Sequence, residues 1–230
     1  MQQRMLKFLL VSGFMIIHVI VSGQKEYDSL GKDVCKCLKK HNERKTKDVL
    51  MQYCLENGIV DHAARIREAE RLNSITGIDQ KKLAWRVTAY LSKECEYFKK
   101  NYLPDPSLVQ KREPQITNGC RDHFKDWFYY VQPSAADSIM DTTYVHFSDD
   151  ICTEWTNNRT SKTVLTITWI TECQFDLTFS QSNDIIKSSF SNPGDKYRHT
   201  VIDINGDVIT LETLFDKHPY YFDMIKINSP

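Results

Sequence analysis

The stretch Thr163-Val-Leu-Thr-Ile-Thr-Trp169 decides the fold class, because polar and apolar side chains alternate along it. Successive side chains of a strand point to opposite faces, so the alternation predicts a strand with one buried and one solvated face. Asn205-Gly206 lies between two similar runs and is a strong hairpin signal, since both residues tolerate a positive φ angle. We therefore expect antiparallel β structure in this half of the chain.

The same strand-forming composition extends from about Thr117 to the C-terminal residues, where Val, Ile, Thr and aromatic side chains dominate. The expected strands are Phe124–Val131, Thr142–Phe147, Cys152–Asn157, Thr163–Thr171, Gln174–Gln181, His199–Ile204, Asp207–Leu214 and Tyr221–Ile227. Seven or eight short antiparallel strands in about 110 residues predict a sandwich or a small barrel.

Residues 25–101 instead show helical spacing of apolar side chains. A first helix is predicted around Tyr27–His41, and a second near Thr46–Glu56, with Asn57-Gly58 as its end. A third is expected over His62–Asn73. A fourth begins after the capping residue Asp79 and carries Leu83, Val87, Leu91, Cys95 and Phe98.

A polar stretch with little periodicity separates the helical segment from the strand-rich segment, and it contains Pro104, Pro106 and Pro114. The sequence therefore predicts an α+β chain of two domains. A small helical bundle with disulfides covers residues 24–102, a linker covers 103–116, and an antiparallel β-barrel or sandwich covers 117–230.

Residues 1–23 are typical of a cleavable secretory signal peptide. Arg4 and Lys7 form a basic start, an apolar run of 14 residues follows, and small residues end it before Gln24. The run is shorter than the roughly 20 apolar residues of a spanning helix, although an uncleaved anchor is the alternative. We expect an exported protein, periplasmic or secreted, with no membrane span after cleavage.

Removal of residues 1–23 leaves 28 basic and 30 acidic residues, because only Arg4 and Lys7 are charged there. The resulting net charge of −2 provides no long-range attraction to nucleic acid or to an anionic membrane. We therefore expect no nucleic-acid partner.

All seven cysteines follow the predicted signal peptide, and export would favour disulfides between them. Cys35 and Cys37 point roughly 200° apart on one helix, so they should have different partners. Two bridges among Cys35, Cys37, Cys54 and Cys95 allow three connectivities that the sequence leaves open. Of these we favour Cys35–Cys95 with Cys37–Cys54.

Three motifs mark the C-terminal half of the chain. They are Cys120 with Phe124-Lys-Asp-Trp-Phe128, Trp169-Ile-Thr-Glu-Cys-Gln-Phe-Asp-Leu-Thr-Phe179, and Val201-Ile-Asp-Ile-Asn-Gly206. Residues 117–230 thereby resemble small exported proteins of Bacteroidetes-type bacteria, which have a lipocalin-like β domain of unknown function. The helical segment with its cysteines resembles, more loosely, segments that precede such domains. Asp126 departs from the family pattern, which has Gly there, and the segment between Trp155 and Thr163 is short.

The resemblance implies a lipocalin-like fold and a disulfide between Cys120 and Cys173. That bridge would tie the first strand of the β domain to its central hairpin. If it forms together with the two helical bridges, Cys152 is the remaining free thiol. The resemblance implies no activity, because the family has no established one.

No catalytic or metal-binding motif stands out. Cys35-x-Cys37 lacks the spacing of a metal-binding CxxC pair. The β-domain histidines have neither HxH nor HExxH spacing; they are His123, His146, His199 and His218. No signature of a nucleophile surrounds Cys152. We expect no catalytic residue, no metal, no cofactor and no enzymatic activity.

Four consecutive aromatic residues, Trp127 to Tyr130, must face both sides of a strand. One side belongs to the core, and the other either packs on the helical domain or lines the mouth of a ligand site. Trp155 and Trp169 could line the same interior. The candidate ligand contacts are therefore Trp127, Tyr129, Trp155 and Trp169.

The leading hypothesis is a non-catalytic exported protein that binds a small apolar ligand or a partner protein in the cell envelope. It rests on analogy of fold. The alternative is a structural or assembly component that acts through protein–protein contacts, and a remote alternative is an unrecognised hydrolase. An enclosed apolar cavity above roughly 300 Å³ would favour a ligand. A filled barrel with an exposed aromatic patch would favour a partner.

Overall fold

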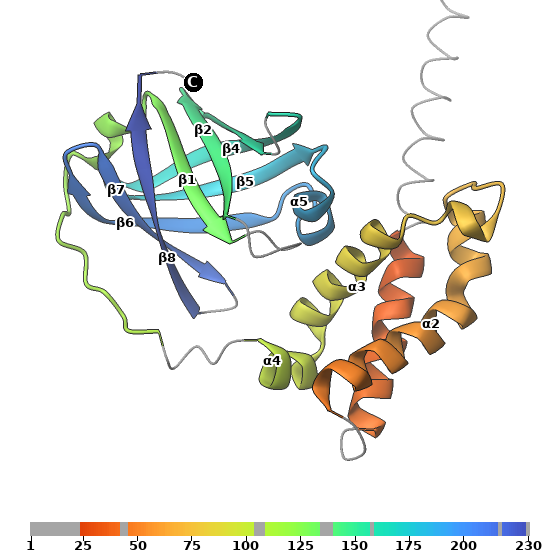
Figure 1. The fold of residues 1–230 in the computed structure, drawn as a ribbon. Coiled ribbons are helices and arrows are strands. Elements are labelled where there is room, and N and C mark those ends of the chain that lie inside the picture. Colours follow the sequence, from red (N-terminus) through yellow and green to blue (C-terminus); the bar gives the residue numbers. More distant parts are fainter. Residues whose placement is uncertain are drawn as a thin grey trace, which may run out of the picture. The chain divides into compact units, whose positions relative to one another are not determined.

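The computed structural model describes residues 24–41, 46–103, 109–133, 140–156, 159–215 and 218–228. The chain divides into two compact units, Met1–Pro104 and Asp105–Pro230 (Figure 1). The predicted signal peptide lies outside the described residues, as do Pro104 and Pro106 of the predicted linker. No helix in the described part of the chain is both long and apolar enough to span a membrane.

The first unit is helical. It contains the helical residues 24–40, α2 (Lys47–Ala69), the 3₁₀ turn η1 (Ile75–Gly77), α3 (Gln80–Glu94) and α4 (Glu96–Tyr102). Asp79 caps α3 as predicted, since its carboxylate accepts a hydrogen bond from the backbone N–H of Lys82 at 3.0 Å.

A single helix, α2, replaces the two helices predicted over Thr46–Glu56 and His62–Asn73, so the prediction that Asn57-Gly58 ends a helix is wrong. Gly58 is buried inside α2. A Cβ at this position would lie 2.7 Å from Leu30 Cδ1 and 3.3 Å from Val34 Cγ2. The glycine thus allows α2 to approach the helix over residues 24–40 closely.

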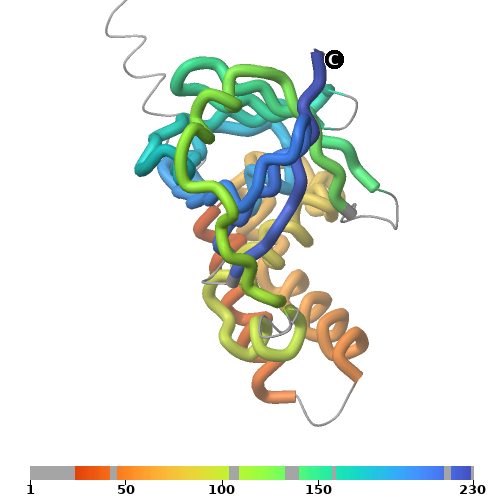
Figure 2. The backbone as a smooth tube through the Cα atoms, turned by 90° about the vertical axis from the view of Figure 1, so that its left-hand side faces the viewer, coloured from red at the N-terminus to blue at the C-terminus, as the bar shows by residue number. Residues whose placement is uncertain are grey.

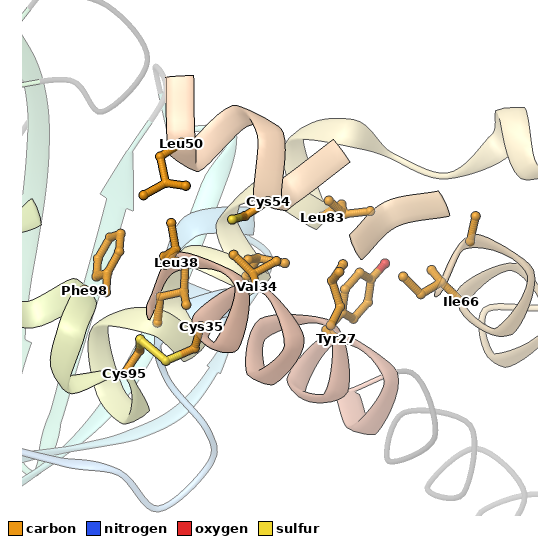
Figure 3. Close-up of a cluster of buried hydrophobic side chains, with 14 of the residues drawn as sticks. Tyr27, Val34, Cys35, Leu38, Leu50, Cys54, Ile66, Leu83, Cys95 and Phe98 are labelled. Carbon is orange, nitrogen blue, oxygen red and sulfur yellow. A yellow bond between two sulfur atoms is a disulfide. The ribbon is translucent and has the colours of Figure 1, made fainter. Parts of the chain in front are cut away.

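The core of the helical unit is one apolar cluster to which all four helices contribute (Figure 3). Its fully buried members include Tyr27, Leu30, Leu38, Leu50, Ile66, Leu83 and Leu91. The Tyr27 hydroxyl donates a hydrogen bond of 2.8 Å to Glu70, just after α2. This bond satisfies the polar end of an otherwise buried ring.

Two disulfides cross-link this cluster. Cys35–Cys95 joins the first helix to the residue between α3 and α4, and Cys37–Cys54 joins the first helix to α2, with Cα–Cα distances of 5.9 and 5.6 Å. These are the pairings that the sequence analysis favours. In a unit with a small core, each cross-link stabilises the fold by restricting the unfolded chain, by about 2–4 kcal/mol.

The second unit is a closed antiparallel barrel in which each strand pairs with the next and β8 returns to β1 (Figures 1 and 2). The predicted small barrel is therefore confirmed, and each predicted strand has a counterpart. The strands are β1 (Trp127–Pro133), β2 (Met140–Ser148), β3 (Ile151–Thr156), β4 (Ser161–Thr171), β5 (Gln174–Ser182), β6 (Lys196–Asn205), β7 (Val208–Phe215) and β8 (His218–Ile227).

The predicted Asn205-Gly206 hairpin joins β6 to β7, and Gly206 has a φ angle of +59°. Two short helical elements of the second unit were not predicted. The 3₁₀ turn η3 (Cys120–His123) precedes β1, and α5 (Ile185–Phe190) connects β5 to β6 (Figure 1).

Aromatic rings pack together at one end of the barrel interior. The Phe124 ring packs against Phe147, Trp169 and Phe175 with centroid distances of 5.0, 5.5 and 5.1 Å. Cys120 of η3 is bonded to Cys173 between β4 and β5, the pairing that the resemblance implies. Three disulfides in one chain are typical of an oxidising compartment outside the cytoplasm.

Candidate ligand site in the barrel

The other end of the barrel contains a cavity of about 230 Å³. Its walls come from α5 and from every strand except β2. The lining residues are Tyr130, Gln132, Glu154, Thr163, Leu165, Leu177, Phe179, Lys187, Ser191, Tyr197, His199, Thr213, Tyr220 and Phe222. Leu165, Leu177 and Phe179 are buried, whereas Tyr220 is half exposed and marks the mouth.

Strand parity determines which side chains reach this cavity. Phe128 is fully buried in the barrel core, so Tyr130 and Gln132 on the same strand face the interior as well. On β3, Cys152 and Thr156 are buried, and Glu154 between them shares their face. Glu154 is therefore a charged residue at an inward position of a β-barrel.

Lys187 on α5 forms an ion pair with Glu154, and both side chains are largely buried, at 20% and 15% exposure. Burial, the largest single effect, lowers the pKa of the Lys187 ammonium, but the charge and hydrogen bond of Glu154 act together with Tyr130 and Asp184, and the pKa is raised. Lys187 therefore keeps its positive charge, and the Glu154 carboxylate beside it compensates that charge.

Tyr130 adds a hydroxyl to this pair, with its Oη 3.4 Å from Oε1 of Glu154. Burial, and then the negative charge of Glu154, raises the pKa of Tyr130 to about 12. The phenol is protonated at neutral pH and donates its hydrogen to the carboxylate.

A network at the start of α5 holds Lys187 in place. The Asp184 carboxylate caps the helix by accepting from the backbone N–H groups of Ile186 and Lys187 at 2.9 and 3.0 Å. It also accepts from the Thr156 hydroxyl of β3 at 3.0 Å. Because α5 is fixed to β3 in this way, the Lys187 side chain is directed at Glu154.

His199 lies on the wall of the cavity and is only 8% exposed. Its ring stacks on Phe175 at 5.3 Å with an interplanar angle of 8°. Its Nδ1 lies 3.0 Å from the backbone oxygen of Tyr197. Burial lowers the pKa of His199, so the imidazole is neutral at pH 7.

The four predicted ligand contacts do not line this cavity. Trp127 stacks on His146 and on Trp155, with ring centroids 4.4 and 5.0 Å apart. Because side chains alternate along a strand, these three residues of β1, β2 and β3 point to the outside of the barrel. Tyr129 has the same outward parity. Trp169 packs on Phe124 and Phe175 at the other end of the barrel, where it lines a second hollow of about 510 Å³ together with charged side chains. A ligand role for these four residues stays a prediction.

Sequence reasoning missed the residues that do line the cavity. A run of four aromatic residues hides the parity of β1, since either face of the strand is equally apolar. The sequence of β3 did contain an indication: Glu154 lies two residues from both Cys152 and Thr156, so all three side chains point to the same face of the strand. Lys187 offered none, because α5 itself was not predicted.

Cys152 is the one cysteine outside the three disulfides, and it is buried. Burial raises the pKa of its thiol well above the ordinary value, which disfavours the nucleophilic thiolate. Among the described residues no cluster of His, Cys, Asp or Glu could hold a metal ion. The polar groups of the cavity can offer hydrogen bonds to a small molecule.

The architecture is that of an up-and-down β-barrel with a hollow end, which unrelated proteins use for different functions. No protein family, curated protein or solved structure matches this chain. The site itself must therefore carry the functional argument.

Proposed function

We propose that this chain is an exported, non-catalytic binding protein that holds a small, mostly apolar compound inside its β-barrel. The observation that supports this best is the cavity of about 230 Å³ at one end of the barrel interior. At the opposite end of the barrel the rings of Phe124, Phe147 and Phe175 pack against one another. The end with the cavity leaves a space among apolar and aromatic side chains that a small compound can occupy.

The size of the cavity limits the compound. Ligand pockets commonly measure roughly 300–1,000 Å³, so this one is below the usual range. An engineered cavity of about 150 Å³ nevertheless binds benzene. A compound with a single ring or with two fused rings fits a cavity whose volume lies between those of the benzene-binding cavity and of a common ligand pocket.

The proposed location is the periplasm or the extracellular space. The signal-peptide pattern of residues 1–23 supports export, and the three disulfides fit an oxidising compartment. In that setting the protein acts as a carrier or sensor in the cell envelope.

Native mass spectrometry of the protein purified from its own host tests the proposal. We expect a small molecule to be retained, and Leu177→Phe, which fills the cavity, to lose it. Val131→Phe is the matched control, because Val131 is 43% exposed. Repeated ligand-free preparations, with no effect of Leu177→Phe on any binding, would contradict the proposal.

The alternative function, an assembly component that acts through protein contacts, has one supporting observation. Trp127, His146 and Trp155 form a stack of rings with outward parity, and the Lys162 ammonium lies 5.9 Å from the Trp155 ring. Aromatic side chains beside a cation are common in protein interfaces. Chemical cross-linking in the native envelope tests it, since Trp127→Ser with Trp155→Ser should abolish a cross-linked product that Leu177→Phe retains.

A further inference from the structure

The hydrogen bond of His199 fixes the tautomer of its ring. The Tyr197 backbone oxygen can only accept, so the nitrogen 3.0 Å away, Nδ1, carries the hydrogen. In a neutral imidazole the other nitrogen, Nε2, is then an acceptor with a free lone pair.

This acceptor has no partner. Among the described residues Nδ1 is the His199 atom that forms a hydrogen bond, and Nε2 forms none. The ring cannot easily turn away, because Phe175 stacks on its face and the Phe222 ring packs edge-on at 6.2 Å and 87°. Among the described residues the Thr143 hydroxyl oxygen is the fully buried side-chain polar atom without a partner, so Nε2 of His199 keeps some access from the cavity that its ring lines. A compound in the cavity can therefore donate a hydrogen bond to it.

The charges around the cavity favour an uncharged occupant. The carboxylate of Glu154 and the ammonium of Lys187 neutralise each other, and His199 is uncharged. The remaining titratable side chains that line the cavity are the phenols of Tyr130, Tyr197 and Tyr220, and burial raises the pKa of the first two, which keeps them uncharged. An ionised compound would bring a charge into the barrel without a counter-ion, which is costly.

The walls specify the shape of the occupant. Phe179, Tyr197, Tyr220 and Phe222 present aromatic rings, and Leu165 and Leu177 complete an apolar lining. Comparison of about 230 Å³ with the benzene-binding cavity of about 150 Å³ indicates a compound of about ten non-hydrogen atoms. Flat rings pack well on such walls.

We propose that the cavity selects an uncharged aromatic compound of one or two fused rings that donates one hydrogen bond to Nε2 of His199. This inference rests on the proposed function, because it names the class of compound that the barrel would hold. Nε2 determines the polar end of the compound, and the aromatic walls determine its size and flatness.

Calorimetric titration of the full mature protein with four probes of equal non-hydrogen atom count tests the inference. Indole donates one N–H, benzofuran has the same shape without a donor, benzoate is an anion and phenethylamine is a cation. We expect indole to bind up to about tenfold more tightly than benzofuran, which is the effect of one net hydrogen bond of about 1 kcal/mol. Benzoate and phenethylamine should bind more weakly than indole.

The variant His199→Phe keeps an aromatic ring but removes the acceptor, so it should bind indole and benzofuran equally. His146→Phe is the matched control, because His146 stacks on Trp127 away from the cavity lining, and it should keep the preference for indole. Circular dichroism checks that both variants are folded. If His199→Phe does not fold, the comparison of indole with benzofuran on the unaltered protein still decides the question.

Equal binding of indole and benzofuran, or tighter binding of either ion, would overturn the inference and leave the proposed function standing. Failure of all four probes, while native mass spectrometry finds a retained compound, would also overturn the inference alone. Failure of all probes with no retained compound would overturn both.

Discussion

Lys187 and Glu154 form an ion pair in the barrel interior, between α5 and β3. Their sequence separation is 33 residues, and the helix that carries Lys187 is capped by Asp184, which is itself bonded to β3. The pair thus links the connection between β5 and β6 to β3, which β4 separates from β5 in the barrel. It also keeps the cavity electrically neutral.

Removal of one partner of this pair should destabilise the protein strongly. Lys187→Met leaves the Glu154 carboxylate buried without a counter-charge, and we expect a loss of about 3 kcal/mol in the free energy of unfolding. The double variant Lys187→Met with Glu154→Leu should recover most of that loss. Urea unfolding measures the free energy of unfolding of the single and of the double variant. Lys125→Met, which removes an exposed partner of Asp122, is the control and should change little. A double variant no more stable than Lys187→Met would show that the pair is not the cause.

Thr143→Val should stabilise the barrel. Thr143 is fully buried and faces Tyr130 across the β1–β2 pair, and its hydroxyl oxygen forms no hydrogen bond of ordinary geometry among the described residues, although it is near enough to interact with the Tyr130 phenol. Valine has nearly the same shape without the polar atom, so we expect a gain of about 1 kcal/mol. Thr163→Val is the matched control. Its hydroxyl is bonded to Ser182 at 2.8 Å, and its loss should destabilise. Thermal melts of both variants test the prediction, and equal shifts would refute it.

One thiol per chain should react with a thiol reagent in denaturant, and none should react in the native protein. The three disulfides leave Cys152, which is buried and whose pKa is raised well above its usual range. The native thiol is therefore both inaccessible and protonated. A spectrophotometric thiol count under non-reducing conditions checks this. A count of seven would mean that no disulfide forms, and a fast reaction in the native state would show that Cys152 is exposed.

The barrel should lose stability as the pH falls below about 6.5, partly through His199. Burial lowers the pKa of His199 from its usual 6.5, so the unfolded state binds the proton more readily. The stabilising contribution is complete above pH 6.5 and disappears as the pH falls through the lower pKa of the folded state. The negative charges of Glu154 and Asp176 raise the pKa of His199, which makes the lowering by burial smaller but does not reverse it.

Urea unfolding at pH 7.5 and at pH 5.5 measures that contribution. The loss of stability between the two should be smaller in His199→Phe than in the unaltered protein, because phenylalanine does not titrate. His146→Phe serves again as the control. The same loss in all three proteins would assign the pH dependence to other groups.

The strands of the β-barrel are predicted well from the sequence because the residue pattern within each strand or turn is enough to identify it. Thr163–Trp169 alternates with the period of a strand, and Asn205-Gly206 has the backbone tolerance of a tight hairpin. Closure between β1 and β8 is not local. It follows from the twist and tilt of the whole sheet, and the sequence left a sandwich equally open.

Gly58 shows why the helical boundaries were less predictable. A glycine after an asparagine is suited to a helix end, but a glycine is equally suited to a close helix–helix contact. Only the positions of Leu30 and Val34 decide between these roles. The residues that line the cavity were not predicted for a similar reason, since the inward face of β1 is identified by the fully buried Phe128 rather than by any local pattern.

The seam between β1 and β8 has a consequence for the order in which the chain folds during synthesis. Trp127 pairs with Ile227 and Tyr129 with Ile225, so the barrel closes only after β8 has been synthesised. Cys37 and Cys54, 17 residues apart, can be oxidised long before that point. Contacts between such distant residues form slowly. Until β8 pairs with it, β1 therefore has a free edge, and during this interval the chain is most exposed to strand exchange and aggregation.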